Sequence, residues 1–265
     1  MPFVTSKDGT RIGYSVVGSG PALVLVDGAL CWRASGPSGP LAERLKDGFT
    51  VYTYDRRGRG ESGDNKPFAV EREAEDLDAV IDAAGGKAAV YAISSGVPLA
   101  LLAANSIDAG KISKMVLYEA PLILDTSRAI DPDYPRKMNE IIARGDNAGA
   151  VKHFMKNGVG VPGFAIFMMQ LMGVMRKLAP VGPTLAYDTA LIAPFLTNMP
   201  LPKGVWSNVT MPVLDIGGGK SDAWMQNAQL EISKALPNAS HKTLAGQNHM
   251  VSPDAIAPLI REFLA

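Results

Sequence analysis

A serine stands between small residues where a buried strand is expected to give way to a helix. Residues 90–93 form an apolar run, residues 98–104 are typical of a helix start, and between them lies Ala92-Ile93-Ser94-Ser95-Gly96. Small neighbours allow a sharp turn that would hold the Ser94 hydroxyl above the sheet edge, at the positive end of the following helix. The pattern predicts a nucleophile, although a tight turn with a buried serine would produce it too.

A serine hydroxyl is a weak nucleophile and needs an adjacent base to take its proton. The chain has three histidines, His153, His241 and His249. His249 follows the last expected strand, residues 240–244, and the carboxyl ends of parallel strands meet at one edge of a sheet. His241 begins that strand and His153 lies in an expected helix, so a surface or packing role suits both. We predict that His249 is the base.

A carboxylate must accept the other imidazole N–H of such a base, and two acids compete for this role. Glu119 ends the apolar run 112–118, where a solvated carboxylate is hard to explain. Asp222 lies in the polar loop after the expected strand 212–217, where it could simply cap the helix from residue 223. We favour Glu119 and keep Asp222 as the alternative. Asp215, inside a strand, is interpreted as a structural buried acid.

Strand and helix patterns alternate along most of the chain, which predicts an α/β fold with a mostly parallel sheet flanked by helices. Strands are expected at 3–6, 11–17, 22–26, 49–54, 88–93, 112–118, 212–217 and 240–244. Between 122 and 205 the alternation lapses, and helices are expected at 134–144, 148–157, 164–178 and 184–195. We therefore predict a core formed by residues 1–121 and 206–265, and a helical cap formed by residues 122–205.

The composition limits the classes of partner. The 265 residues include 26 Lys and Arg against 26 Asp and Glu, so charge gives no reason to expect nucleic acid or a membrane surface. One cysteine, Cys31, excludes an internal disulfide, and no signal-peptide pattern begins the sequence. We expect a cytoplasmic protein, with a homodimer as a candidate assembly. The histidines and the cysteine lack metal-ligand spacing, so neither a metal nor a cofactor is expected.

The chain resembles the α/β-hydrolase superfamily over almost its whole length, because four motifs occur in the order and spacing of that superfamily. They are Asp27-Gly28-Ala29 in place of the usual His-Gly-x, the arginine-rich run 55–62, the turn at Ser94, and Gly246-Gln247-Asn248-His249. The resemblance implies an oxyanion hole formed by the backbone N–H of Ser95 and one from Gly28 or Ala29. It also implies that the arginine-rich run is structural. The arrangement with Glu119 as the acid is similar to that of the zearalenone lactone hydrolases.

The expected reaction is hydrolysis of a small apolar ester or lactone through an acyl-enzyme. Segment 164–178 is rich in methionine, which is typical of a buried helix and also of a lid over an apolar pocket. Candidate substrate-lining residues are Trp32, Met168, Met172, Trp206 and Trp224. A serine at position 94 makes a haloalkane dehalogenase an unsuitable interpretation, because those enzymes have aspartate at the nucleophile position. The alternatives are a small-ligand receptor with little turnover, and a carbon–carbon hydrolase, lyase or cofactor-free haloperoxidase.

Overall fold

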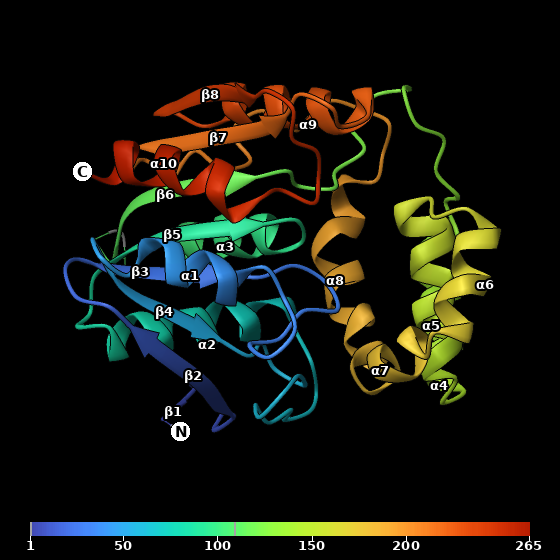
Figure 1. The fold of residues 1–265 in the computed structure, drawn as a ribbon. Helices are drawn as coiled ribbons and strands as arrows, with labels where there is room; N and C mark the ends of the chain where they lie inside the picture. The colour runs from blue at the N-terminus through green and yellow to red at the C-terminus, as the bar shows by residue number, and fades with distance from the viewer. Residues whose placement is uncertain (1, 109) are drawn as a thin grey trace.

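The computed structural model describes residues 2–108 and 110–265, and an eight-stranded sheet lies at its centre (Figure 1). The strands are β1 (Phe3–Thr5), β2 (Arg11–Val17), β3 (Ala22–Val26), β4 (Thr50–Tyr54), β5 (Ala88–Ile93), β6 (Ile112–Tyr118), β7 (Val213–Gly218) and β8 (Ala239–Leu244). Their order in the sheet is β1-β2-β4-β3-β5-β6-β7-β8. β2 is antiparallel to both of its neighbours, and the other pairs are parallel. The predicted, mostly parallel sheet is confirmed.

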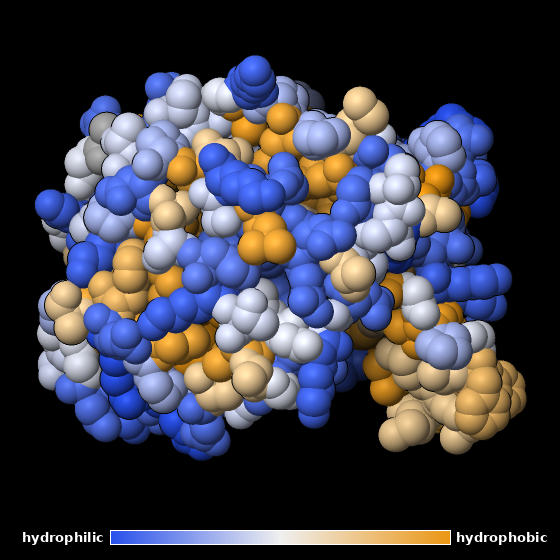
Figure 2. All heavy atoms as spheres, turned by 90° about the horizontal axis from the view of Figure 1, so that it is seen from above, coloured by the Kyte–Doolittle hydropathy of each residue, from blue (hydrophilic) through white to orange (hydrophobic). Residues whose placement is uncertain are grey.

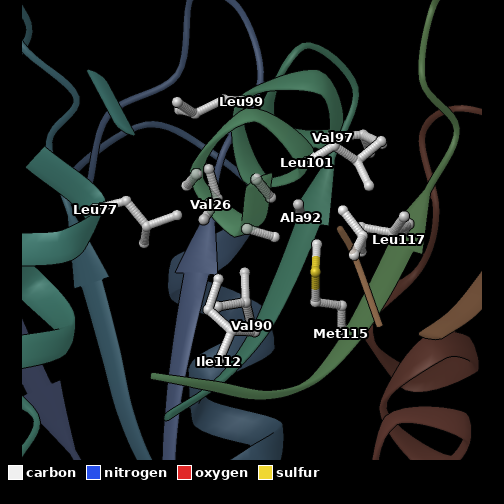
Figure 3. Close-up of a cluster of buried hydrophobic side chains, with 14 of the residues drawn as sticks. Val26, Leu77, Val90, Ala92, Val97, Leu99, Leu101, Ile112, Met115 and Leu117 are labelled. Carbon is white, nitrogen blue, oxygen red and sulfur yellow. The ribbon is translucent and has the colours of Figure 1, made fainter. Parts of the chain in front are cut away.

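Helices cover both faces of this sheet. One face carries α1 (Ser38–Leu45) and α10 (Pro253–Leu264), and the other carries α2 (Val70–Ala83), α3 (Gly96–Ser106) and α9 (Ala223–Ala235). Side chains alternate between the faces, so Leu25 packs toward α1 while Val26 packs toward α2 and α3. Figure 3 shows part of the apolar cluster on the α2 and α3 side of the sheet, with Leu77 from α2, Leu99 from α3 and Val26 from β3. Burial on both faces explains why the central strands β3 and β5 are continuous apolar runs.

The regular elements between β6 and β7 are helices, joined by loops and one isolated bridge between Ile123 and Leu196. The helices are α4 (Tyr134–Ala143), α5 (Asn147–His153), η1 (Phe154–Val159), α6 (Gly163–Leu171), α7 (Val174–Leu178), η2 (Ala179–Thr184), α8 (Leu185–Ile192) and η3 (Ala193–Phe195). They lie beyond the arrowheads of the parallel strands (Figure 1) and share an apolar cluster of their own. We call residues 122–205 the cap, and these bounds stay a prediction.

Two helices of the cap differ from the predicted ones. The single helix predicted over 164–178 is wrong, because α6 ends before Gly173 and α7 begins after it. Gly173 has a φ of +74°, a left-handed conformation that glycine adopts at little cost and that ends a helix. The helix predicted over 148–157 changes at residue 154 from α5 to η1, a π-helical segment of a kind often found at functional sites.

Candidate active site

Ser94 lies in the turn between β5 and α3. Its φ is +58°, a conformation that is costly for a residue with a side chain and is typical of strained functional turns. The neighbouring backbone leaves no room for larger residues. A Cβ on Gly28 would lie 2.7 Å from Ser94 Cβ, and one on Gly96 would lie 2.6 Å from the carbonyl oxygen of Val26. The sharp turn predicted at Ser94 is therefore present.

Ser94, His249 and Glu119 form a chain of close polar contacts. His249 Nε2 lies 3.2 Å from Ser94 Oγ, and His249 Nδ1 lies 3.1 Å from Glu119 Oε2. The three residues follow β5, β8 and β6, so the sheet brings them together at the carboxyl ends of its strands. The imidazole is 35% exposed and the carboxylate is completely buried. With the Nδ1 proton directed at the carboxylate, Nε2 is free to accept the serine proton.

The backbone fixes the direction of the Glu119 carboxylate. Glu119 Oε1 accepts a hydrogen bond from the Gly218 N–H at 2.6 Å, which leaves Oε2 for His249. A Cβ on residue 218 would lie 2.8 Å from Oε1, so the close approach requires glycine there. Both carboxylate oxygens thus have partners, as a buried charge requires.

The other two acids considered from the sequence lie elsewhere. Asp222 is exposed, and its carboxylate accepts a bond from Trp224 Nε1 at 3.4 Å. It stands at the N-cap position of α9 without a side-chain capping bond. Asp215 is buried and pairs with His241 Nδ1 at 2.7 Å, and burial raises the pKa of Asp215 to about 6. The structure therefore brings Glu119, and neither aspartate, to the predicted base.

The residues predicted for the oxyanion hole surround Ser94. Ala29 and Ser95 line the same cavity as Ser94, and Gly28 packs against its side chain. Within residues 2–108 and 110–265, the N–H groups of Ala29 and Ser95 donate to no protein acceptor. Unengaged backbone donors beside a nucleophile are suited to hold a developing oxyanion.

Asp27, which replaces the usual histidine before Gly28, does not line the cavity. Ser38 at the start of α1 donates its hydroxyl to the Asp27 carboxylate at 2.6 Å. Burial raises the pKa of Asp27 to about 6, against the opposing effects of this hydrogen bond and of nearby arginines. The side chain anchors the loop to α1 and leaves the backbone of the turn accessible from the cavity.

A buried ionic network supports the turn from the side of the core. Asp188 of α8 accepts bonds from Ser95 Oγ at 2.7 Å, from Arg56 at 2.8 Å and from Arg59 at 2.7 Å. Arg59 also donates to the Gly28 carbonyl at 2.6 Å. Burial alone would raise the pKa of Asp188, but Arg59 and Arg56 hold it below its ordinary value. These arginines are paired inside the protein, in agreement with a structural role for the run 55–62.

Sequence reasoning missed two residues of this region. Asp188 is the single acid in the otherwise apolar α8, and such an isolated charge among apolar residues is a usable signal of a buried partner. Arg128 lines the cavity, where its guanidinium lies 4.3 Å from the Trp224 ring centre and donates to the Gly158 carbonyl at 2.6 Å. Nothing in its local sequence distinguishes Arg128 from other surface arginines.

Ser94 and His249 open into a cavity of about 290 Å³ between the sheet edge and the cap. Most of its wall is apolar, and its larger apolar side chains include Ile123, Ile130, Phe154, Val159, Ile192, Leu196, Met225 and Met250. Arg128, Asp188, Lys220 and Asp222 add charged groups to the lining. The site is therefore a mainly apolar pocket with a small number of polar groups, as is usual for small-molecule sites.

Of the five residues predicted to line this cavity, only Trp224 does so. Trp206 is buried in the core, with its ring centre 5.5 Å from that of Phe195. Trp32 packs against the cap cluster. Met168 and Met172 lie on the outer surface of the protein, because the break at Gly173 separates them from the buried Met175. The prediction is corrected at these four positions.

The family model of the alpha/beta hydrolase family matches residues 17–259. The chain belongs to this family. Our alpha/beta hydrolase is also similar over its full length to an alpha/beta hydrolase from Sphaerobacter thermophilus. The two chains share 44% identity with a TM-score of 0.89, and the match covers 100% of each. The predicted fold is confirmed, and the protein is a hydrolase enzyme.

Two further comparisons are more distant. The enol-lactonase of Burkholderia xenovorans LB400 is 19% identical to this alpha/beta hydrolase, with a TM-score of 0.70 and 99% of each chain covered, which shows a shared fold. A non-heme haloperoxidase of Rhodococcus erythropolis is 33% identical over 133 residues, 48% of this chain and 47% of that protein. The match thus spans about half the length of that relative.

Proposed function

We propose that this hydrolase cleaves a carboxylic ester or lactone of a small apolar substrate through an acyl-enzyme, with Ser94, His249 and Glu119 as its catalytic residues. The observation that carries the proposal is the Ser94–His249–Glu119 chain, with separations of 3.2 and 3.1 Å at the wall of an apolar cavity. The narrower resemblance to zearalenone lactone hydrolases stays a prediction.

In the first half of the reaction, Ser94 Oγ attacks the carbonyl carbon while His249 Nε2 takes its proton. The Glu119 carboxylate stabilises the imidazolium that forms. The carbonyl oxygen becomes an oxyanion and accepts hydrogen bonds from the N–H groups of Ser95 and Ala29. The bond to the alcohol oxygen then breaks, and His249 donates its proton to that oxygen. With a lactone, the alcohol stays attached to the acyl group.

In the second half, His249 removes a proton from water, and the resulting hydroxide attacks the acyl carbon. The bond to Ser94 breaks, the serine oxygen regains a proton from His249, and the carboxylic acid leaves. Asp188 contributes indirectly, because its bonds to Ser95 and to the arginine that holds Gly28 keep the oxyanion-binding turn in place. The cavity volume of about 290 Å³ supports a small substrate.

A series of p-nitrophenyl esters of increasing chain length, together with simple lactones, tests the proposal. The wild type is expected to turn over the shorter esters, and Ser94→Ala is expected to lower kcat/KM by about 10⁴-fold or more. Ser106→Ala is the matched control, because Ser106 is an exposed serine of α3 whose hydroxyl donates to the backbone of its own helix. It should retain wild-type turnover.

Activity that persists in Ser94→Ala would refute the assignment of the nucleophile. A folded wild type without turnover on any ester or lactone would favour the ligand-receptor alternative. Halide oxidation with hydrogen peroxide, in place of ester turnover, would favour the haloperoxidase alternative, to which the half-length match with the Rhodococcus relative points.

A further inference from the structure

Helix α6 exposes an unusual amount of apolar surface. The exposed fractions are 77% for Phe164, 54% for Phe167, 66% for Leu171 and 75% for Met172. Together with Met168 these residues form what we call the α6 face. Figure 2 shows an apolar area at the end of the molecule where Figure 1 places α6. A contiguous apolar patch on a protein surface usually marks a site of interaction with a partner or a membrane.

The surroundings of the α6 face are positively charged. Residues 147–187 contain Lys152, Lys156, Arg176 and Lys177 but no Asp or Glu, although basic and acidic residues balance over the whole chain. All four cations are exposed, and in the described part of the chain none forms an ion pair. The neighbouring α4 differs, because its Arg136 is paired with Glu140.

Three of these four cations flank the apolar face in space as well as in sequence. α6 packs against η1, which contains Lys156, and against α7, which contains Arg176 and Lys177. Helices that lie in the headgroup region of a membrane typically have such an apolar face bordered by lysine and arginine. Their apolar side chains enter the acyl boundary, and their cations contact anionic lipids.

We propose that the α6 face docks this hydrolase onto anionic lipid bilayers. The contact is peripheral, since the nine residues of α6 extend about 14 Å against a hydrocarbon thickness of about 30 Å. Among the described residues no single helix is long and apolar enough to cross a bilayer. Only α6 and the helical segment Val174–Phe195 taken together are long and apolar enough, and the two are bent by 82° relative to each other.

Docking in this orientation brings the cavity near the lipid. Phe154 and Val159 of η1 form part of the cavity wall, and η1 also packs against α6. An apolar ester dissolved in the bilayer would then leave the lipid close to Ser94. This last step depends on the proposed function, whereas the docking itself does not.

A second copy of the chain suits the α6 face less well than a bilayer. In a two-fold symmetric dimer the same patch meets itself, so the three cations that border the face of one subunit would approach those of the other. Like charges at such a contact repel each other, and residues 147–187 supply no acid to compensate. An anionic bilayer matches both the apolar face and its charged border.

Sedimentation of the 265-residue chain with vesicles tests the proposal without any substrate, so its outcome does not depend on hydrolase activity. We expect binding to vesicles that contain phosphatidylglycerol, little binding to phosphatidylcholine alone, and weaker binding as salt is raised. The double variant Phe164→Asp, Leu171→Asp and the double variant Lys156→Glu, Lys177→Glu should each weaken binding by about tenfold or more.

Single-residue controls carry the same types of change elsewhere. Leu230→Asp alters an exposed leucine of α9, and Lys87→Glu alters an exposed lysine before β5. Both should bind vesicles like the wild type. Thermal unfolding of all variants, with hydrolysis of a water-soluble ester, shows that the α6 variants retain their fold.

Three results would overturn the proposal. The first is the absence of binding to anionic vesicles at low salt. The second is equal binding to neutral and anionic vesicles. The third is a dimer in solution, measured by analytical ultracentrifugation, that Phe164→Asp dissociates, since the α6 face would then be a contact between copies of the chain.

Discussion

Two residues of the candidate site occupy costly backbone conformations. Ser94 has a φ of +58° and Glu119 a φ of +48°, and each follows a buried strand of the central sheet. Such conformations persist where the surrounding structure holds them, and they are concentrated at functional sites. The strain therefore lies at the proposed nucleophile and the proposed acid, which must keep fixed positions relative to His249.

The choice of acid is testable with two single variants. Glu119→Gln should lower kcat by about 10³- to 10⁴-fold, because an amide neither fixes the required imidazole tautomer nor stabilises the imidazolium. Asp222→Asn is the matched control. Its carboxylate lines the cavity but contacts Trp224 rather than His249, so kcat should change by no more than a few fold. Steady-state kinetics on one p-nitrophenyl ester measure both effects.

The opposite pattern would contradict the account. If Asp222→Asn abolishes turnover while Glu119→Gln keeps it, then Asp222 reaches His249 during catalysis and the arrangement found in the structure is not the working one. Thermal unfolding of Glu119→Gln is needed beside the kinetics, because this carboxylate also accepts the Gly218 N–H inside the core.

Sequence reasoning anticipated the proximity of the residues whose positions follow from strand ends. Ser94, Glu119 and His249 each follow a strand, and parallel strands bring their carboxyl ends together whatever the details of packing. It failed for most of the predicted cavity lining, because hydrophobicity does not tell which apolar residue faces a cavity. Trp206 proved to be core, and Met172 lies on the surface.

At the scale of secondary-structure elements, α8 joins the cap to the catalytic turn. Its Asp188 is bonded to Ser95 and to two buried arginines, of which Arg59 holds the Gly28 carbonyl. The two backbone segments proposed to bind the oxyanion therefore share one acidic partner on a helix of the cap. A displacement of α8 would disturb both segments together.

Asp188→Asn should destabilise the protein by about 3 kcal/mol, because the buried Arg59 loses its carboxylate partner and Arg56 keeps only Glu73. It should also lower kcat on esters, since Ser95 and Gly28 lose their common support. Glu140→Gln, which removes an exposed ion-pair partner on α4, is the control and should leave both properties nearly unchanged. Urea unfolding and steady-state kinetics measure the two effects.

The same network predicts a pH dependence. The pKa of Asp188 in the folded protein is held below its ordinary value, so the unfolded chain binds its proton more readily. Stability from this group is therefore present above about pH 4 and is lost as the pH falls through the folded pKa. The free energy of unfolding of Asp188→Asn should be lower than that of the wild type at neutral pH, and this gap should narrow in acid. A gap that stays the same across this pH range would contradict the assignment.

The cap was the least predictable group of elements. Its helical character follows from the lapse in strand patterns, but the break at Gly173 and the change to η1 at residue 154 depend on tertiary packing. A glycine within an apolar helical pattern is compatible with both a continuous and a broken helix. The outward orientation of α6 therefore became visible only in the structure.

For the whole molecule, the sequence predicted the architecture well and the surface poorly. Alternating strand and helix patterns identified the mostly parallel sheet, because burial on both faces of a sheet dictates apolar strands. The balanced net charge, however, gave no reason to expect a membrane surface. It is an average over 265 residues and conceals the acid-free stretch 147–187 beside the α6 face.

The most direct test of the central claim is covalent labelling of the nucleophile. p-Nitrophenyl diethyl phosphate resembles an activated ester, and an activated serine displaces p-nitrophenol from it to form a stable diethylphosphoryl adduct. Mass spectrometry of the intact and digested protein should find one adduct, located on Ser94, whose formation parallels the loss of esterase activity. Ser94→Ala should acquire none. Loss of activity with the adduct on another residue, or full activity with Ser94 labelled, would contradict the account.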